Sequence, residues 1–278
     1  MDLSHARREV ALVTGASGGI GPWIALGLAR AGRHVVLAGR DAGRVEAARA
    51  WVEERAPGSA PEGEVADLSS LAAARELGER VAARHGALAV LVNNAGVFRD
   101  RREVTAEGRE VVLAVNHLAP FVLTRALMPA LRAAGGGGRV VNVGSSSSDR
   151  ASIDPDDLEL RRGWGLVRAY GRSKLAMMMA GFEWAEREPG VVSVVVHPGG
   201  VRTGIVRAGG VVQLGWAALS PFLLTPEQGA EVPVRAAVAE GVAGGQYLKA
   251  RGAVAPNRRA LDAGLRARVW AATERLAG

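Results

Sequence analysis

Short apolar segments alternate with longer amphipathic segments along most of this sequence. The apolar segments are rich in Val, Leu and Ala, which is typical of strands that are buried on both faces of a parallel sheet. Parallel strands need crossover connections, and the amphipathic segments have the length and period of helices. We expect strands at Val10–Thr14, His34–Ala38, Glu64–Ala66, Leu88–Asn93, Arg139–Val143 and Val191–His197, and helices that include Asp41–Arg55, Ser69–His85 and Ala106–Ala133. This alternation predicts an α/β fold with a doubly wound parallel sheet and helices on both faces.

The chain has 278 residues, and nothing in the sequence marks an internal domain boundary. We therefore expect a single domain over residues 1–278, with a core over about 9–250 and a C-terminal helical extension over about 251–278. The chain contains no cysteine, which excludes disulfides and thiolate catalysis. No apolar run precedes the first expected strand, so we expect a cytoplasmic protein without a membrane span.

The net charge of +7 raises the question of an anionic partner. Nearly all the positive charge is arginine, since Lys174 and Lys249 are the only lysines, and the arginines are spread over nearly every expected helix. A nucleic-acid binder more often gathers them on one face with interleaved aromatic residues, which make up only 4% of this chain. We expect no nucleic-acid partner; that alternative predicts salt-sensitive binding to DNA.

The segment Thr14–Gly21 directly follows the first expected strand and opens a helix that runs to about Ala31. A dinucleotide pyrophosphate needs a close backbone approach, which a Cβ atom blocks, and free amides at a helix N-terminus. Glycines in this segment meet both needs where ligands bind in open α/β sheets. A turn with a purely structural role is the alternative, because the chain has 37 glycines. The expected cofactor residues here are Gly15, Ser17, Gly18, Gly19, Ile20 and Gly21.

Tyr170 and Lys174 lie four residues apart, on one face of an expected helix. The chain has only two tyrosines and two lysines, so a chance pair at this spacing is improbable. A free phenol has a pKa near about 10, and a nearby cation favours its anion. We therefore expect Lys174 to lower the pKa of Tyr170, so that the phenol exchanges protons as a catalytic acid/base.

Together these segments resemble the short-chain dehydrogenase/reductase family. The resemblance includes the Gly-x-x-x-Gly-x-Gly spacing after Thr14, Asn93–Gly96, the Tyr-x-x-x-Lys pair and His197–Thr203, and it covers roughly residues 9 to 250. It implies a single Rossmann-type domain that transfers a hydride between a nicotinamide cofactor and an alcohol or carbonyl. The 24 residues from 146 to 169, with Asn116-His117-Leu118, are similar to the retinol-dehydrogenase-like branch.

The resemblance assigns roles to further residues. Ser145 corresponds to the serine that binds the substrate oxygen, with Ser146 as the alternative because four serines follow one another. Asn116 corresponds to an asparagine that routes protons towards the lysine, whereas we expect His117 to serve packing or a local hydrogen bond. Asp67 corresponds to a residue that approaches the adenine, and a helix N-cap is its structural alternative. The implied cofactor contacts also include Leu68, Asn94, Ala95, Gly96, Tyr170, Lys174, Pro198, Gly199, Val201 and Thr203, whereas Asn93 is expected to support the sheet.

The end of the second expected strand indicates which cofactor binds. NAD enzymes usually place an acidic residue at the strand tip, whereas an arginine accommodates the 2′-phosphate of NADP. Here Gly39 occupies the tip and Arg40 follows, which favours NADP(H) over NAD(H). Two features weaken this inference: Asp41 is adjacent, and Gly18 stands where many NADP-using relatives have a second basic residue.

One uncharged segment indicates the class of substrate. The uncharged segment Ala208–Pro226 is expected to form an apolar lid, which suggests a lipophilic or aromatic alcohol or carbonyl. A non-catalytic NADP(H)-binding regulatory or scaffold protein is the alternative function. Metal binding is not expected, because His5, His34, His85, His117 and His197 lack a ligand-like spacing. Association into a homodimer or homotetramer is expected from the family.

Overall fold

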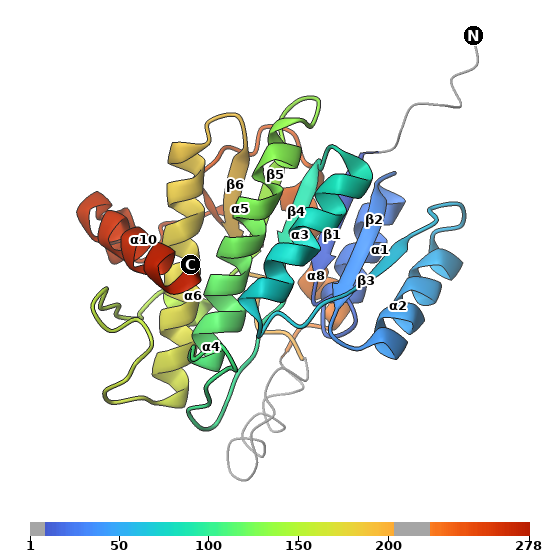
Figure 1. The fold of residues 1–278 in the computed structure, drawn as a ribbon. Helices are drawn as coiled ribbons and strands as arrows, with labels where there is room; N and C mark the ends of the chain where they lie inside the picture. Colours follow the sequence, from blue (N-terminus) through green and yellow to red (C-terminus); the bar gives the residue numbers. More distant parts are fainter. Residues whose placement is uncertain (1–8, 203–222) are drawn as a thin grey trace.

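A computed structural model describes residues 9–202 and 223–278 of the chain, and its centre is an eight-stranded sheet (Figure 1). The strand order is β3-β2-β1-β4-β5-β6-β7-β8, and each neighbouring pair is parallel except β7 with β8. The strands are β1 (Val10–Thr14), β2 (His34–Gly39), β3 (Glu62–Val65), β4 (Val90–Asn93), β5 (Arg139–Val143), β6 (Val192–Val196), β7 (Tyr247–Lys249) and β8 (Gly252–Ala253). The predicted Rossmann-type α/β fold is confirmed.

The sheet has its topological switch point between the neighbouring strands β1 and β4. From β1 it goes outwards to β2 and β3, and then returns to add β4 on the other side of β1. Val13 lies in register with Leu37 of β2 on one side and with Val92 of β4 on the other. Such a switch point leaves a crevice beyond the carboxyl ends of the strands, where ligands bind in open α/β sheets.

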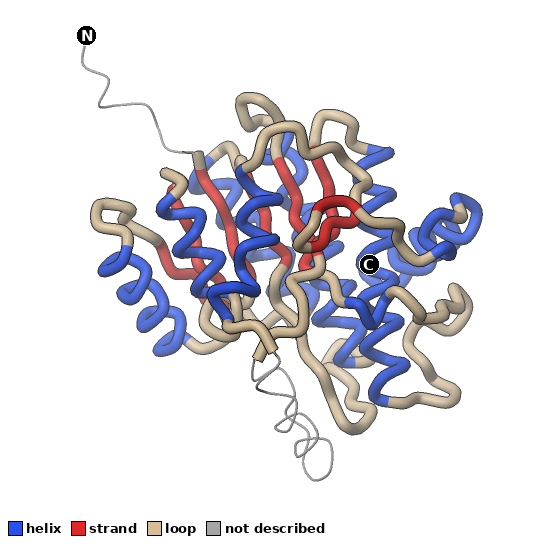
Figure 2. The backbone as a smooth tube through the Cα atoms, turned by 180° about the vertical axis from the view of Figure 1, so that it is seen from behind, coloured by secondary structure: helices blue, strands red, loops and turns tan. Residues whose placement is uncertain are grey.

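Helices cover both faces of the sheet, as Figures 1 and 2 show from opposite sides. One face carries α3 (Leu71–His85), α5 (Ala119–Arg132) and α6 (Leu166–Arg187), and the other carries α1 (Gly21–Arg30), α2 (Ala42–Arg55) and α8 (Pro226–Val238). The buried hydrophobic residues form two main clusters, one on each side of the sheet. The sheet strands are therefore apolar on both faces, as their composition predicted.

The helix expected over Ala106–Ala133 begins later than predicted, at Val111. Glu110 is its N-cap, with a side chain that accepts a hydrogen bond from the amide of Leu113 at 2.7 Å. The residues before it form a turn that the bridge between Val104 and Glu110 closes. The helix then runs as α4 (Val111–Leu113), a π-helical turn η1 (Ala114–Leu118) and α5.

The C-terminal residues add both strands and helices to the core fold. The short strands β7 and β8 extend the sheet beyond β6, which the sequence pattern did not predict. The expected helical extension is present as α9 (Arg258–Leu261) and α10 (Ala263–Ala277), and α10 packs against α6 (Figure 1).

One helical stretch in the described part of the chain, Val111–Arg132, is long and apolar enough to cross a membrane. In this fold 83% of its most apolar window is buried inside the protein, so its composition is explained by its place in the core. Most of the apolar segment Ala208–Pro226, expected as a lid, lies outside the described residues, as does Thr203.

Candidate active site

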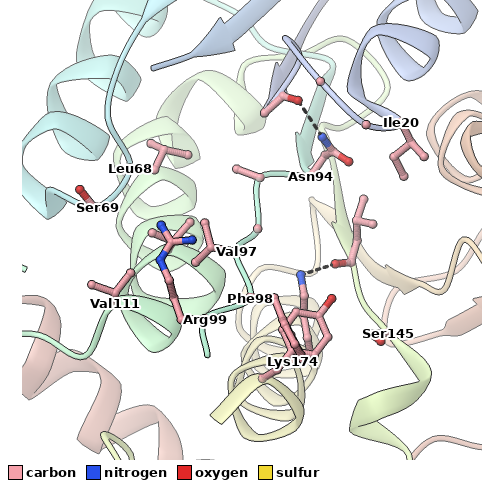
Figure 3. Close-up of a pocket in the computed structure, with 18 of the residues that line it drawn as sticks. Ile20, Leu68, Ser69, Asn94, Val97, Phe98, Arg99, Val111, Ser145 and Lys174 are labelled. Carbon is pink, nitrogen blue, oxygen red and sulfur yellow. Dashed lines mark hydrogen bonds between the residues drawn. The ribbon is translucent and has the colours of Figure 1, made fainter. Parts of the chain in front are cut away.

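A cavity of about 1150 Å³ opens at the carboxyl ends of the strands (Figure 3). It extends from the glycine loop and the tip of β2 to the ends of β5 and β6 and the first turns of α6. Among the described residues, Gly21 and Asn116 are the predicted site residues that do not line it. The predicted residues that line it are Gly15, Ser17, Gly18, Gly19, Ile20, Arg40, Asp67, Leu68, Asn94, Ala95, Gly96, Ser145, Tyr170, Lys174, Pro198, Gly199 and Val201.

The glycines of the loop are required by their backbone geometry. Gly15 has a φ of 63°, and a Cβ atom there would lie 2.8 Å from the Cα of Ala95. A Cβ atom on Gly21 would overlap the carbonyl oxygen of Gly15, so this residue allows α1 to start directly beneath the loop. Gly21 therefore shapes the loop from below, whereas Gly15 lines the cavity itself.

Thr14 and Asn94 hold the loop against the end of β4. The Asn94 side-chain amide donates to the carbonyl oxygens of Thr14 at 2.8 Å and Gly15 at 3.3 Å. In return, the Thr14 hydroxyl oxygen accepts from the amides of Asn94 at 3.0 Å and Ala95 at 3.1 Å. The buried Asn93 instead donates to Asn142 and Thr124, at 3.0 and 3.2 Å, which is the sheet-supporting role expected of it.

The tip of β2 has a glycine followed by an arginine. A Cβ atom on Gly39 would lie 2.7 Å from Oγ of Ser17 and 2.9 Å from Cγ2 of Val45, so a larger residue there would require both side chains to move. Asp41 caps α2, and its carboxylate accepts from the amide of Arg44 at 2.8 Å. Both Asp41 and the exposed Arg40 line the cavity.

Arg44 is a cavity residue that the sequence reasoning missed. Its Nη2 donates to the carbonyl oxygen of Ser17 at 3.0 Å, and the same nitrogen lies 2.8 Å from where a Cβ atom of Gly18 would be. The guanidinium thus occupies the space above Gly18, the position for which the family resemblance implies a second basic side chain in many NADP-using members. A signal was present in the sequence, since Arg44 lies only four residues after Arg40, in the first turn of the helix that Asp41 caps.

Asp67 is not the N-cap of α3, which corrects the structural alternative for this residue. Ser70 caps that helix, and its hydroxyl accepts from the amide of Ala73 at 3.2 Å. The carboxylate of Asp67 accepts from the amide of Ser69 at 2.9 Å and lies at the cavity beside the buried Leu68.

Tyr170, Ser145 and Lys174 come together at the other end of the cavity. Tyr170 lies in the second turn of α6, and Lys174 lies one turn further along the same helix. The side chain of Ser145, just beyond the end of β5, hydrogen-bonds to that of Tyr170. Its oxygen also accepts from the amide of Ser147 at 3.2 Å. The structure therefore places Ser145, and not Ser146, against the phenol.

The pKa of Tyr170 is raised in this structure, so the acidic phenol expected from the sequence is wrong for the protein alone. Burial disfavours the phenolate, and the hydrogen bond with Ser145 offsets this only in part. Lys174 does not reverse the effect, because its ammonium nitrogen lies 6.0 Å from the ring centroid of Tyr170 and donates to the carbonyl oxygen of Val143 at 2.8 Å. Burial also lowers the pKa of Lys174 to about 8.

Asn116 lies behind the cavity, in the π-helical turn η1. Its amide holds the backbone of Val97 from both sides, accepting from the amide at 2.7 Å and donating to the carbonyl oxygen at 3.0 Å. It also donates to the hydroxyl of Ser173, at 3.0 Å, beside Lys174 in the chain. His117 is buried against Thr273, with 2.8 Å between Nε2 and Oγ1, which confirms its packing role.

The cavity beside Tyr170 has a mostly apolar wall. Phe98 packs edge-to-face on the Tyr170 ring with 5.0 Å between centroids, and Arg99 lies beside Val97 in the same wall (Figure 3). Val97, Phe98 and Arg99 directly follow the Asn93–Gly96 segment, but no local pattern indicated that Phe98 would pack on the phenol. Its other apolar residues are Val104, Val111, Val115, Leu166 and Val167.

Comparisons with known proteins agree with this geometry. A family model described as short chain dehydrogenase matches residues 9–210. A protein of Streptomyces sp. (strain C5), provisionally named as a daunorubicin C-13 ketoreductase, is 40% identical over 270 residues, which cover 96% of this chain and 92% of the relative. Retinol dehydrogenase 12 of Bos taurus is 37% identical over 236 residues, which cover 84% of this chain and 74% of the relative.

A solved structure of a short chain dehydrogenase has a similar fold. A short chain dehydrogenase from Burkholderia cenocepacia J2315 in complex with NADP is similar with a TM-score of 0.71 at 28% sequence identity, covering 87% of this chain and 95% of that chain. The fold, the cavity and the similarity over most of the chain agree: the protein is an oxidoreductase of the short-chain dehydrogenase/reductase family and resembles its retinol-dehydrogenase-like branch.

Proposed function

We propose that this protein uses NADPH to reduce the carbonyl group of a lipophilic or aromatic small molecule. The observation that carries the proposal is the environment of Tyr170, a phenol at the cavity whose pKa is raised by burial. Such a phenol is protonated at neutral pH and is suited to donate a proton. Reduction requires a proton donor at the carbonyl oxygen, whereas oxidation of an alcohol requires a base.

The side chains around Tyr170 each have a role in the proposed reaction. The bound nicotinamide supplies the hydride. The hydroxyls of Ser145 and Tyr170 hold the substrate oxygen, and Tyr170 gives it a proton as charge develops there. Lys174 is expected to bind the ribose of the cofactor and to stabilise the phenolate that remains. Asn116 acts as a positioning residue, because it fixes the backbone of Val97 and the hydroxyl of Ser173 and is not in the cavity.

The preference for NADPH is supported by the charges at the tip of β2. A 2′-phosphate binds well to guanidinium groups, which donate two parallel hydrogen bonds. Arg40 and Arg44 both line this part of the cavity, and Gly39 occupies the strand tip where NAD enzymes usually have an acid. A relative with a similar fold has been crystallised with NADP, which supports the same preference.

The class of substrate is supported by the cavity wall and by the names of relatives. Phe98, Leu166 and the neighbouring valines present apolar surface beside the phenol. An apolar wall with a few polar groups at one end is typical of sites for lipophilic ligands. The relatives' names refer to a daunorubicin C-13 ketoreductase and to a retinol dehydrogenase, which act on large ring-containing molecules.

The test compares the wild type with Tyr170→Phe on a panel of aromatic and lipophilic ketones, following NADPH consumption. The variant should bind NADPH with an affinity close to that of the wild type but lose at least about a hundredfold in turnover, because it has no proton to give. If wild type and variant consumed NADPH equally, Tyr170 would not be the proton donor. If the wild type bound NADPH but reduced no ketone in the panel, the non-catalytic alternative would be favoured.

A further inference from the structure

Three side chains lie close together at the amino ends of the strands, at the opposite end of the sheet from the cavity. His34 is the first residue of β2, Glu62 is the first residue of β3, and His85 is the last residue of α3. The carboxylate lies between the two imidazoles: Nε2 of His34 is 2.8 Å from Oε1 of Glu62, and Nε2 of His85 is 3.5 Å from Oε2. The three ligand atoms all lie within 4.8 Å of one another.

His85 has an unsatisfied nitrogen in this cluster. Its Nε2 is shielded from solvent and has no hydrogen-bond partner among the described residues, because the contact with Glu62 is longer than a normal hydrogen bond. An unsatisfied buried nitrogen costs free energy unless a partner binds it. A neutral imidazole nitrogen in this position can bind a metal ion through its lone pair.

We propose that His34, Glu62 and His85 form a binding site for a divalent transition-metal ion such as Zn²⁺. Two imidazole nitrogens and one carboxylate oxygen are a ligand set that zinc accepts. Tetrahedral coordination at about 2.0–2.1 Å places neighbouring ligand atoms about 3.4 Å apart. The 3.5 Å between His85 and Glu62 already matches this separation, whereas the 2.8 Å between His34 and Glu62 must lengthen when the ion binds. The side chains are 12 to 32% exposed, so water can reach the fourth position.

The ion replaces the hydrogen bond between His34 and Glu62. In the metal-free cluster, this bond joins the His34 ring to the carboxylate. When the metal binds, each Nε2 presents its lone pair and each neutral ring carries its proton on Nδ1. The site is remote from Tyr170, so we expect a structural effect that ties the starts of β2 and β3 to the end of α3.

The Arg84 guanidinium competes with the metal ion for the carboxylate of Glu62. Its Nη1 lies 3.0 Å from Oε2 of Glu62 and 2.8 Å from Oε1 of Glu64. The guanidinium can stay with Glu64 when Glu62 turns to the ion, but its charge opposes a second cation nearby. The site should therefore bind zinc more tightly when Arg84 is neutralised, an effect opposite to that of removing a ligand.

The experiment titrates ZnCl₂ into tag-free protein by isothermal calorimetry and repeats thermal unfolding with zinc and with EDTA. One saturable site is expected, with a higher unfolding temperature in zinc. His34→Gln and His85→Gln should each weaken binding by at least about tenfold, whereas Arg84→Gln should strengthen it. His5→Gln is the matched histidine control and should bind as the wild type does.

Binding of NADPH by each variant checks that it is folded, and it separates this site from the proposed reaction. The proposal is overturned if the wild type shows no saturable zinc binding. It is also overturned if the folded His85→Gln protein binds zinc as tightly as the wild type, or if Arg84→Gln leaves the affinity unchanged. In those cases the cluster is only a hydrogen-bonded ion pair.

Discussion

Lys174 donates a hydrogen bond to the carbonyl oxygen of Val143 at 2.8 Å, so its ammonium is fixed to the last residue of β5. The side chain is buried, and this lowers its pKa to about 8, whereas burial raises the pKa of Tyr170. Lys174 therefore loses its proton at a lower pH than Tyr170 does. The unperturbed groups titrate in the opposite order, tyrosine before lysine. This order determines how reduction should depend on pH.

The rate of ketone reduction should fall as pH rises through about 8. Below this pH Lys174 is charged and Tyr170 keeps its proton, so both are in the form that the proposed reaction needs. Above it Lys174 loses its charge first. The pH profile of kcat/KM for NADPH-dependent reduction reports this group in the free enzyme. Lys174→Arg should move the alkaline limb upwards, and an unmoved limb in an active variant would assign it to another group.

Arg40 and Arg44 should distinguish NADPH from NADH. Each contributes charged hydrogen bonds to a 2′-phosphate, and a bond of this kind is worth about 1.5–3 kcal/mol. Arg40→Ala and Arg44→Ala should each weaken NADPH binding by about tenfold or more, and should leave NADH binding nearly unchanged.

Cofactor binding can be followed by nicotinamide fluorescence, without any substrate. Arg168→Ala is a matched control, since this exposed arginine is not among the residues that line the cavity. An equal loss of NADH and NADPH affinity in Arg44→Ala would show that the guanidinium only supports the glycine loop through Ser17.

Ser145 and Ser146 should differ sharply when each is changed to alanine. Ser145→Ala removes a hydroxyl that contacts Tyr170 and is expected to hold the substrate oxygen, and loss of one such donor costs about 100- to 1000-fold in kcat. Ser146→Ala should have a small effect. Steady-state kinetics on one ketone compares the two, and the reverse order would move the serine role to Ser146.

The parts of the site that were predicted are those encoded in local segments. Gly15 needs a positive φ, and Tyr170 and Lys174 share one helix face, so both features can be read from neighbouring residues. The strands were found for a similar reason, because their apolar composition is local. The two-residue strand β8 and the late helix start at Val111 depend on pairing and capping by residues elsewhere in the fold.

The features that were missed depend on residues that are distant in sequence. Arg44 reaches Ser17 only because β2 lies beside β1. His34 and His85 are far apart in the chain, and only the packing of α3 against the sheet brings them together with Glu62. The pKa of Tyr170 was predicted with the wrong sign because motif spacing reports the presence of Lys174 but not how deeply the phenol is buried.

Trp270 should be the residue of α10 whose loss most destabilises the fold. It is 7% exposed, and its ring packs edge-to-face on Phe121 at 4.8 Å and on Trp184 at 4.7 Å between centroids. Trp270→Ala leaves a cavity among these rings and should lower the free energy of unfolding by about 3–5 kcal/mol, measured by urea denaturation. Leu261→Ala, in the same C-terminal extension but 58% exposed, should change it by no more than about 0.5 kcal/mol. Of these two residues, Trp270 is buried in the core and Leu261 is exposed. Similar losses in both variants would therefore contradict a role for α10 in completing the core.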